Sequence, residues 1–303
     1  MSALTVVRAG PGASVQDLGR PGFSDVGLGA AGAADQGSAA LANRMVGNLP
    51  EAAVLEALLG SVSLRTDAHV VAATAGAACP VSVTRADGSV RGAAAFEVLT
   101  LAPGDTLHVG APASGLRVYL AVRGGFAVEP VLGSRSWDTL AQLGPAPVAA
   151  GDVLPVGSDA AGWPIVDAVA PPLLPRPWEP TVLEVTAGPR DDWFTEDWHR
   201  VLTGQEYRVG TDSDRVGVRT EGAEPLRRTV TRELPSEGVE TGSLQVPPTG
   251  SPVVFLADHP VTGGYPVVAV LTPASVDRAA QLRPGDAIRF RIVGARRDGT
   301  IGA

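Results

Sequence analysis

Short strand-like runs recur along the chain, and they restrict its fold more than any other feature. Each run is rich in β-branched residues and is bounded by Gly, Pro, Asp or Ser, which is typical of strands. The runs lie at 116–122, 182–186, 207–209, 253–257, 267–271 and 287–293. Helical patterns are few, so we expect a mainly β protein with barrel or sandwich closure.

Two segments carry the signals of a helix. Asp35 is placed to cap a helix that runs to about Val46, and Thr272 is placed to cap a second helix with Pro273 at its first position. A third segment, 51–64, is ambiguous. Its composition favours a helix by propensity, whereas the Ser-Val-Ser-Leu alternation near its end favours a strand.

Weak internal sequence similarities predict that the chain consists of two related halves. A Gly-Asp turn followed by an extended run occurs at 103–110, 150–157 and 284–292, and the runs 115–122 and 264–271 also look alike. Because the spacing is irregular, a solenoid is not expected.

A proline-rich stretch divides the chain. The segment APPLLPRPWEP, residues 170–180, contains five prolines in eleven residues, and proline is excluded from helix interiors and central strands. We expect a first domain at 1–170, a linker at 171–180 and a second domain at 181–303.

Composition excludes several functions. The formal charge of −8 offers no general attraction for nucleic acid or anionic membrane. All 24 cationic side chains are arginine, so no P-loop lysine, Schiff base, Ser-Ser-Lys triad or biotinylated lysine is available. Cys79 is the only cysteine, and the four histidines show no metal-ligand spacing, so no metal site is expected.

The sequence predicts no membrane span, signal peptide or dinucleotide-binding site. No apolar run approaches the roughly 20 residues of a membrane span, and the first residues lack a signal-peptide pattern, so we expect a cytoplasmic protein. The segment 27–32 matches G-x-G-x-x-G, but the residues before it are not strand-like, so dinucleotide binding is not expected.

Polar residues embedded in glycine-rich turns are the candidate functional feature. They occupy 16–22, 133–136, 236–238, 245–248 and 262–266. Glycine lets backbone N–H groups approach an anion or carbonyl, arginine can clamp a carboxylate, and carboxylates can move protons. For any single stretch the alternative is a turn held by a structural salt bridge.

In order along the chain, these stretches resemble the family known as allophanate hydrolase subunit 2, the C subunit of 5-oxoprolinase or biotin-dependent carboxyltransferase. The matching segments are SVQDLGRPG (14–22), GAADQGSAALANRMVGN (32–48), AAVLEALLG (52–60), RVYLAVRGGF (117–126), VLGSRS (131–136), DRVGVRTEG (214–222), SEGVETGSLQVPPTGSPVVFLAD (236–258), TGGYP (262–266) and AQLRPGDAIRF (280–290). The sequence departs from the family pattern at Trp137, where a threonine is common, and at Val216, where a methionine is frequent.

The resemblance implies two tandem cyclophilin-like β-barrel domains with a few short helices, and a strand beginning in 51–60. It also implies a hetero-oligomer of this chain with a homologous B subunit and with an A subunit, which together open 5-oxo-L-proline to L-glutamate with ATP hydrolysis. We expect this chain to be inactive alone, and ATP to have a site that is unknown and can lie on another polypeptide of the complex. The allophanate hydrolase label conflicts with the absence of lysine.

Two alternatives stay open. One is a carboxyltransferase component that uses biotin on a separate carrier, as in urea carboxylase. The other is a regulatory antagonist that binds the homologue of the B subunit, the partner described as a kinase inhibitor in some bacteria.

Oxoproline presents a carboxylate and a lactam carbonyl, which suggests roles for the residues in the glycine-rich turns. We predict Arg20 and Arg135 as anion ligands, with Tyr265 and the Gly263 and Gly264 amides orienting the carbonyl. The predicted proton carriers are Asp17, Glu237 and Asp258, and the further substrate-binding candidates are Asp35, Asn43, Ser136, Gln245 and Thr262.

Overall fold

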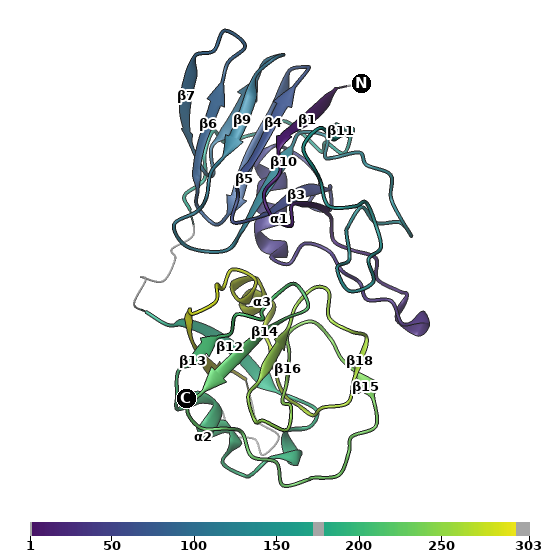
Figure 1. Ribbon diagram of the computed structural model, residues 1–303, viewed down its shortest axis with the longest axis vertical. Coiled ribbons are helices and arrows are strands. Elements are labelled where there is room, and N and C mark those ends of the chain that lie inside the picture. The colour runs from purple at the N-terminus through teal and green to yellow at the C-terminus, as the bar shows by residue number, and fades with distance from the viewer. Residues whose placement is uncertain (1, 172–178, 295–303) are drawn as a thin grey trace. The chain divides into compact units, whose positions relative to one another are not determined.

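The computed structural model describes residues 2–171 and 179–294 (Figure 1). The chain divides into two compact units. The first comprises 1–20, 31–138 and 142–174, and the second comprises 21–30, 139–141 and 175–303. The division falls inside the proline-rich stretch 171–180, of which 172–178 lie outside the described residues. Two short segments, 21–30 and 139–141, belong to the second unit although they precede that stretch.

Two antiparallel sheets build the first unit. Their orders are β11-β1-β4-β9-β6-β7 and β2-β3-β10-β5-β8. The strands are β1 (Ala3–Arg8), β2 (Ser14–Gln16), β3 (Val54–Leu58), β4 (Val62–Thr66), β5 (Val70–Gly76), β6 (Pro80–Thr84), β7 (Val90–Ala94), β8 (Val98–Leu101), β9 (Thr106–Val109), β10 (Arg117–Val122) and β11 (Val153–Pro155). Leu4, Leu64 and Leu107 of the first sheet share one core with Leu55 and Leu120 of the second.

Helix α1 (Gln36–Met45) covers the other face of the five-stranded sheet. Successive residues of a strand face opposite sides, so Leu120 joins the inter-sheet core while Tyr119 packs with the helix residues Ala39 and Met45. Small side chains on this face of the sheet, such as Ala75, leave room for the helix.

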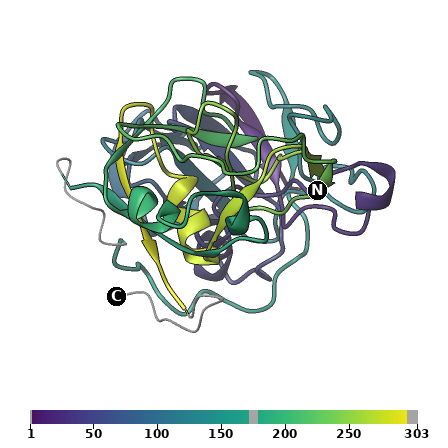
Figure 2. The ribbon, with the colours of Figure 1, turned by 90° about the horizontal axis from the view of Figure 1, so that it is seen from below.

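A closed barrel forms the second unit. Its order is β12-β19-β16-β17-β14-β13-β20, in which β12 and β20 run parallel. The strands are β12 (Thr181–Ala187), β13 (Tyr207–Val209), β14 (Gly217–Gly222), β16 (Ser243–Gln245), β17 (Val253–Phe255), β19 (Val267–Leu271) and β20 (Ala287–Ile292). Figure 2 shows the ribbon from below, including the short helices of this unit. The helices α2 (Trp198–Thr203) and α3 (Pro273–Ala279) contribute side chains to its core. Short 3-10 turns lie at η1 (Ser24–Val26) and η2 (Asp191–Trp193).

The expected class, mainly β with a few short helices, is confirmed, and each of the six predicted runs contains a strand. The helices expected after Asp35 and Thr272 are also present. The helix favoured by propensity within 51–64 is wrong, because Val54–Leu58 forms the buried strand β3 between β2 and β10. The short helix α2 was not predicted.

The three Gly-Asp turns have the same geometry in both units. Gly104, Gly151 and Gly285 have φ of +89°, +97° and +89°, a left-handed region that glycine enters without strain. In each turn the aspartate carboxylate accepts a hydrogen bond from a backbone N–H three residues earlier, at 2.9, 2.7 and 2.8 Å. The turns lead into β9, β11 and β20.

Candidate functional site

A two-stranded ribbon brings two of the predicted stretches together in the second unit (Figure 1). Strand β15 (Glu237–Gly238) pairs antiparallel with β18 (Thr262–Gly263), with Glu237 opposite Gly263. The connection between β17 and β19 is therefore not a plain loop. Gly238, Thr262, Gly264 and Tyr265 are exposed, so the ribbon is accessible to a ligand.

Gln245, at the end of β16, holds the ribbon in place. Its side-chain Nε2 donates to the backbone oxygen of Tyr265 at 3.0 Å, and Gln245 itself is only 6% exposed. A Cβ atom added at Gly263 would lie 2.3 Å from this Nε2. Only glycine therefore fits at 263 while the glutamine amide keeps its position.

Glu237 is paired with an arginine that the sequence did not single out. Arg190 donates from Nε to Oε2 at 2.9 Å and from Nη2 to Oε1. This side-chain hydrogen bonding from Arg190 is the main reason that the pKa of Glu237 lies below its ordinary value. Glu237 is therefore ionised at neutral pH, which suits binding and positioning better than proton transfer.

A second unanticipated arginine lies beside Tyr265. The Cζ atom of Arg228 is 5.6 Å from the centroid of the Tyr265 ring, and Nη2 donates to the backbone oxygen of Val246. We call the cluster the ribbon site. It consists of Arg190, Arg228, Glu237, Gln245 and the segment 262–265.

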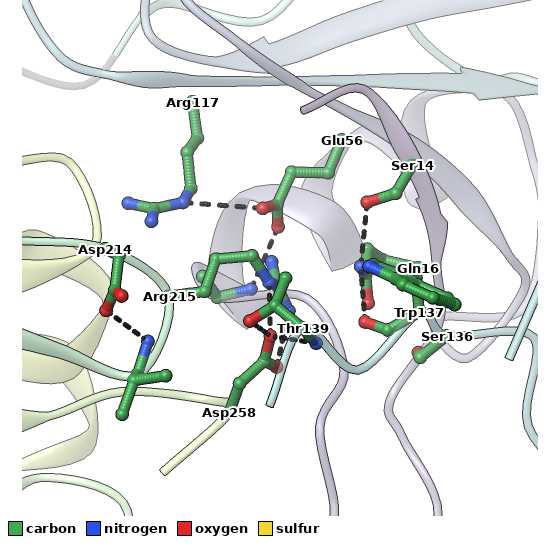
Figure 3. A network of polar contacts seen from close by, with 12 residues as sticks. Ser14, Gln16, Glu56, Arg117, Ser136, Trp137, Thr139, Asp214, Arg215 and Asp258 are labelled. Atoms are coloured by element: carbon green, nitrogen blue, oxygen red, sulfur yellow. Dashed lines mark hydrogen bonds and ion pairs between the residues drawn. The ribbon is translucent and has the colours of Figure 1, made fainter. Parts of the chain in front are cut away.

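Asp258 lies in a separate network of the second unit (Figure 3). Arg215 donates to both carboxylate oxygens, from Nε at 2.8 Å and from Nη2 at 3.0 Å. The backbone N–H and the hydroxyl of Thr139 donate to Oδ2 at 2.9 and 2.6 Å. Since Asp258 is 1% exposed and both oxygens are engaged, the geometry favours an anchoring role over proton transfer.

Asp17 is the centre of a polar cluster in the first unit. Its Oδ1 accepts from the Gly19 N–H at 2.8 Å and from the Ser134 and Ser136 hydroxyls at 2.6 Å each. Its Oδ2 accepts from the Arg135 N–H at 2.6 Å. The predicted stretches 16–22 and 133–136 therefore meet, with the carboxylate fixing the turn.

Arg20 and Gln16 bind the same segment from within. The Arg20 guanidinium donates from Nη2 to the Ser136 backbone oxygen. Gln16 Nε2 donates to the Trp137 oxygen at 3.1 Å and to the Ser14 hydroxyl at 2.9 Å (Figure 3). Arg20 is only 2% exposed. The side chain of Arg135 donates from Nε to the Val128 oxygen at 2.9 Å.

Asp35 and Asn43 serve helix α1. The Asp35 carboxylate accepts from the Ser38 N–H at 2.8 Å and caps the helix. Asn43 donates to the Ala52 oxygen at 2.7 Å and accepts from the Asn48 amide at 3.0 Å. Asn43 is fully buried, so its contacts indicate a structural role.

The buried ion pair between Glu56 and Arg117 was also not predicted from the sequence. Arg117 Nε lies 3.4 Å from Glu56 Oε1 (Figure 3). The Tyr119 hydroxyl donates to Glu56 Oε2 at 2.9 Å. Burial, then the Glu56 and Asp35 charges, raise the pKa of Tyr119 well above its ordinary value. Tyr119 therefore stays protonated and ties β10 to β3.

Within residues 2–171 and 179–294, no three His, Cys, Asp or Glu side chains gather in a way that could hold a metal ion. Nor do the described residues contain a helix with the length and apolarity needed to cross a membrane.

A family model, described as carboxyltransferase domain, subdomain A and B, matches residues 26–292. Among curated proteins, the C subunit of 5-oxoprolinase from Escherichia coli is 33% identical over 290 residues, which cover 95% of this chain and 90% of that protein. Urea amidolyase of Lachancea kluyveri is 30% identical over 320 residues, covering 95% of this chain but 17% of that protein.

Two solved structures share the fold. The structure of TTHA0988 has a TM-score of 0.81 at 36% identity, and the match covers 96% of this chain and 56% of that one. The urea carboxylase of Kluyveromyces lactis has a TM-score of 0.87 at 28% identity, with 96% of this chain and 27% of that one covered.

Proposed function

The chain belongs to the carboxyltransferase domain family, subdomains A and B, and from this premise we propose that it is the C subunit of an ATP-dependent 5-oxoprolinase. In this proposal it works with the A and B subunits to open 5-oxo-L-proline to L-glutamate, and its own contribution is to bind and orient the lactam.

The observation that carries the proposal is the extent of the match to the C subunit of 5-oxoprolinase. The similarity to the E. coli protein extends over 90% of that protein, whereas it accounts for 17% of the L. kluyveri urea amidolyase. Most of the amidolyase, and therefore most of what that enzyme does, lies outside the similar region.

The ribbon site suits a small cyclic amide. A Cβ atom at Gly264 would have only the Leu234 oxygen nearby, at an ordinary contact distance of 3.6 Å, and Gly264 is exposed, so a ligand can approach the backbone there. In our proposal the Gly264 N–H and the Tyr265 hydroxyl orient the lactam carbonyl, because preorganised donors stabilise the negative charge that develops on such an oxygen. The Gly263 N–H is engaged in the ladder opposite Glu237 and supports this arrangement. Gln245 holds these groups in place.

The sequence has no lysine and therefore no P-loop lysine to bind the phosphates of ATP. We propose that ATP binds on another polypeptide of the complex, and no step on this chain passes through it.

The test is ADP release driven by 5-oxo-L-proline, using this chain purified with its candidate A and B subunits. We expect ADP release to require both oxoproline and this chain. Equal oxoproline-dependent release from the A and B subunits alone would overturn the proposal.

A second candidate function is carboxyl transfer from biotin. It is favoured by the TM-score of 0.87 to the urea carboxylase of K. lactis, which is higher than the 0.81 to TTHA0988. Because the chain lacks lysine, biotin would have to be attached to a separate carrier. This function predicts turnover that depends on bicarbonate and is blocked by avidin, neither of which the oxoprolinase proposal requires.

A further inference from the structure

The two arginines of the ribbon site differ in whether they form an ion pair with a carboxylate of the described residues. Arg190 is neutralised by Glu237 through two hydrogen bonds. Arg228 has no carboxylate partner among the residues that the structure describes. Its one hydrogen bond to them runs from Nη2 to the Val246 oxygen, and its Nε is buried without a partner in the same part of the chain.

Two contacts fix the position of Arg228, and a further hydrogen bond joins the groups that it contacts. It binds the oxygen of Val246, the residue directly after Gln245. Gln245 in turn binds the backbone oxygen of Tyr265, and the Tyr265 ring lies 5.6 Å from the guanidinium carbon. These contacts hold a cation beside an aromatic ring that is 44% exposed.

We propose that Arg228 binds the carboxylate of a small cyclic amide that lies against Tyr265, with its amide carbonyl toward the Gly264 N–H. The inference rests on the proposed function and assigns the carboxylate end of the substrate. A guanidinium fork binds carboxylates bidentately. Because Nε is buried and Nη2 gives one hydrogen to the Val246 oxygen, Nη1 and the second hydrogen of Nη2 are the donors for such a pair.

Burial gives Arg228 a reason to bind an anion. It is the main cause that lowers the pKa of Arg228 below its ordinary value, against a smaller opposing effect of Tyr265. A partly desolvated cation without a counter-ion is unfavourable, so an incoming carboxylate recovers free energy that an exposed arginine would not offer.

The other arginines near the predicted stretches fit this role less well. Arg20 is 2% exposed, so a ligand cannot reach it without rearrangement. Arg135 also makes one hydrogen bond to a backbone oxygen, that of Val128, but its Nε is satisfied by it, and Arg135 belongs to the first unit, outside the ribbon site. Arg215 is paired with Asp258. Arg228 is only half-buried, so it combines access with a missing counter-ion.

The test compares R228Q with R227Q in the complete complex. Arg227 is exposed, and its side chain makes no hydrogen bond, ion pair or ring contact with the described residues. R227Q therefore removes the same formal charge as R228Q, from the neighbouring position. We expect R228Q to raise the KM for 5-oxo-L-proline about 10- to 100-fold, since hydrogen bonds to charged groups contribute about 1.5–3 kcal/mol. R227Q is expected to leave that KM unchanged.

A second ligand tests whether Arg228 recognises the carboxylate of oxoproline rather than its ring. 2-Pyrrolidinone has the same lactam ring without the carboxylate, and its inhibition constant against oxoproline should be equal in R228Q and wild type. An equal KM for oxoproline in R228Q and R227Q, or an equal loss of both ligands, overturns the inference. If R228Q does not fold, R228K keeps the charge but not the fork, and a raised KM for oxoproline alone is then the supporting result.

Failure of the proposed function gives a different result. If the wild-type complex shows no oxoproline-driven ADP release, the assignment of Arg228 is judged by saturation-transfer NMR of 5-oxo-L-proline and 2-pyrrolidinone with the full chain. Selective binding of the carboxylate that R228Q loses and R227Q retains supports the site. The assignment is refuted if the wild-type chain does not bind oxoproline, or if R228Q binds oxoproline as well as wild type does.

Discussion

Gly263 is the position in the ribbon site where an added methyl group has the sharpest consequence. A Cβ atom there would meet the Gln245 amide at 2.3 Å, and the glutamine would have to leave the Tyr265 oxygen. Because the obstructing atom ends a flexible side chain, we expect G263A to fold with a loss of about 1–2 kcal/mol in the free energy of unfolding. Oxoproline-dependent ADP release should fall at least tenfold.

Gly264 provides the matched control for this substitution. A Cβ atom at Gly264 would have only the Leu234 oxygen nearby, at an ordinary 3.6 Å. We expect G264A to unfold like wild type, so the difference in stability between the two variants isolates the Gln245 contact. Turnover of G264A should also fall, because its methyl group would lie where the ligand approaches. Equal free energies of unfolding of the two variants would show that displacing the Gln245 amide costs no stability.

The site residues differ in how far the sequence reveals them. Glycine-rich turns are visible locally, so the segment 262–266 could be identified from its own letters. Arg190 and Arg228 could not, because what an arginine does depends on the group it faces. Glu237 lies 47 residues from Arg190, and only the closed barrel brings them together. For the same reason the anchoring of Asp258 by Arg215 and Thr139 was not predictable.

At the scale of elements, Asp258 fixes the segment 139–141 within the second unit. Both of its oxygens are bound, and Arg215 is itself only 11% exposed. Removing the carboxylate would take from the largely buried Arg215 the anion to which it donates two hydrogen bonds, so we expect D258A to lower the free energy of unfolding by about 3–5 kcal/mol. T139V, which removes one hydroxyl donor, should cost about 1–3 kcal/mol.

Urea unfolding together with the pH profile of turnover checks this anchoring role. D258N should lower stability and leave the shape of the pH profile unchanged. A variant that unfolds like wild type but loses one limb of the profile would instead establish Asp258 as a proton carrier.

The Gly-Asp turns give a graded prediction. All three glycines have positive φ, but a Cβ at Gly151 or Gly285 would have nothing within 4 Å, whereas one at Gly104 would meet Ala86 Cβ at 3.0 Å. We expect G151A and G285A to cost about 1 kcal/mol each from backbone strain, and G104A to cost more. Thermal unfolding of the three variants tests the order, and an equal cost for all three would contradict it.

Elements were predictable where the local signal and the tertiary context agree. The Asp35 cap, the alternation in 287–293 and the Gly-Asp turns all report conformations that short-range chemistry favours. The segment 51–64 shows the opposite case. Its alanines and leucines favour a helix, yet Val54–Leu58 lies between two strands of a sheet, and burial on both faces outweighs a propensity difference of less than about 1 kcal/mol per residue.

At the scale of the whole molecule, three buried groups make stability sensitive to alkaline pH. Burial raises the pKa of the Cys79 thiol from 9.0 to about 11. It likewise raises the pKa of Tyr207 from 10.0 to about 12 and that of Tyr119 well above its ordinary value. Each group stays protonated in the folded chain at a pH where the unfolded chain has already released its proton.

The sign of the effect follows from these raised values. A group whose pKa is higher in the folded state contributes its full stability below the unfolded pKa and loses it as pH rises through the folded pKa. We therefore expect the free energy of unfolding to be flat up to about pH 9 and to fall between pH 9 and 12. Cys79 and Tyr207 should each account for about 2–3 kcal/mol of the fall.

Urea unfolding at successive pH values, with C79A and Y207F, separates the two contributions. C79A should flatten the decline between pH 9 and 11, and Y207F should flatten it between pH 10 and 12, even if each variant is less stable at neutral pH. The two groups lie in different units, so their effects on the slope should add, as expected for independent sites. Slopes identical to wild type in both variants would mean that the thiol and the phenol are already solvated in the folded chain, contrary to their burial at 7% and 1% exposure.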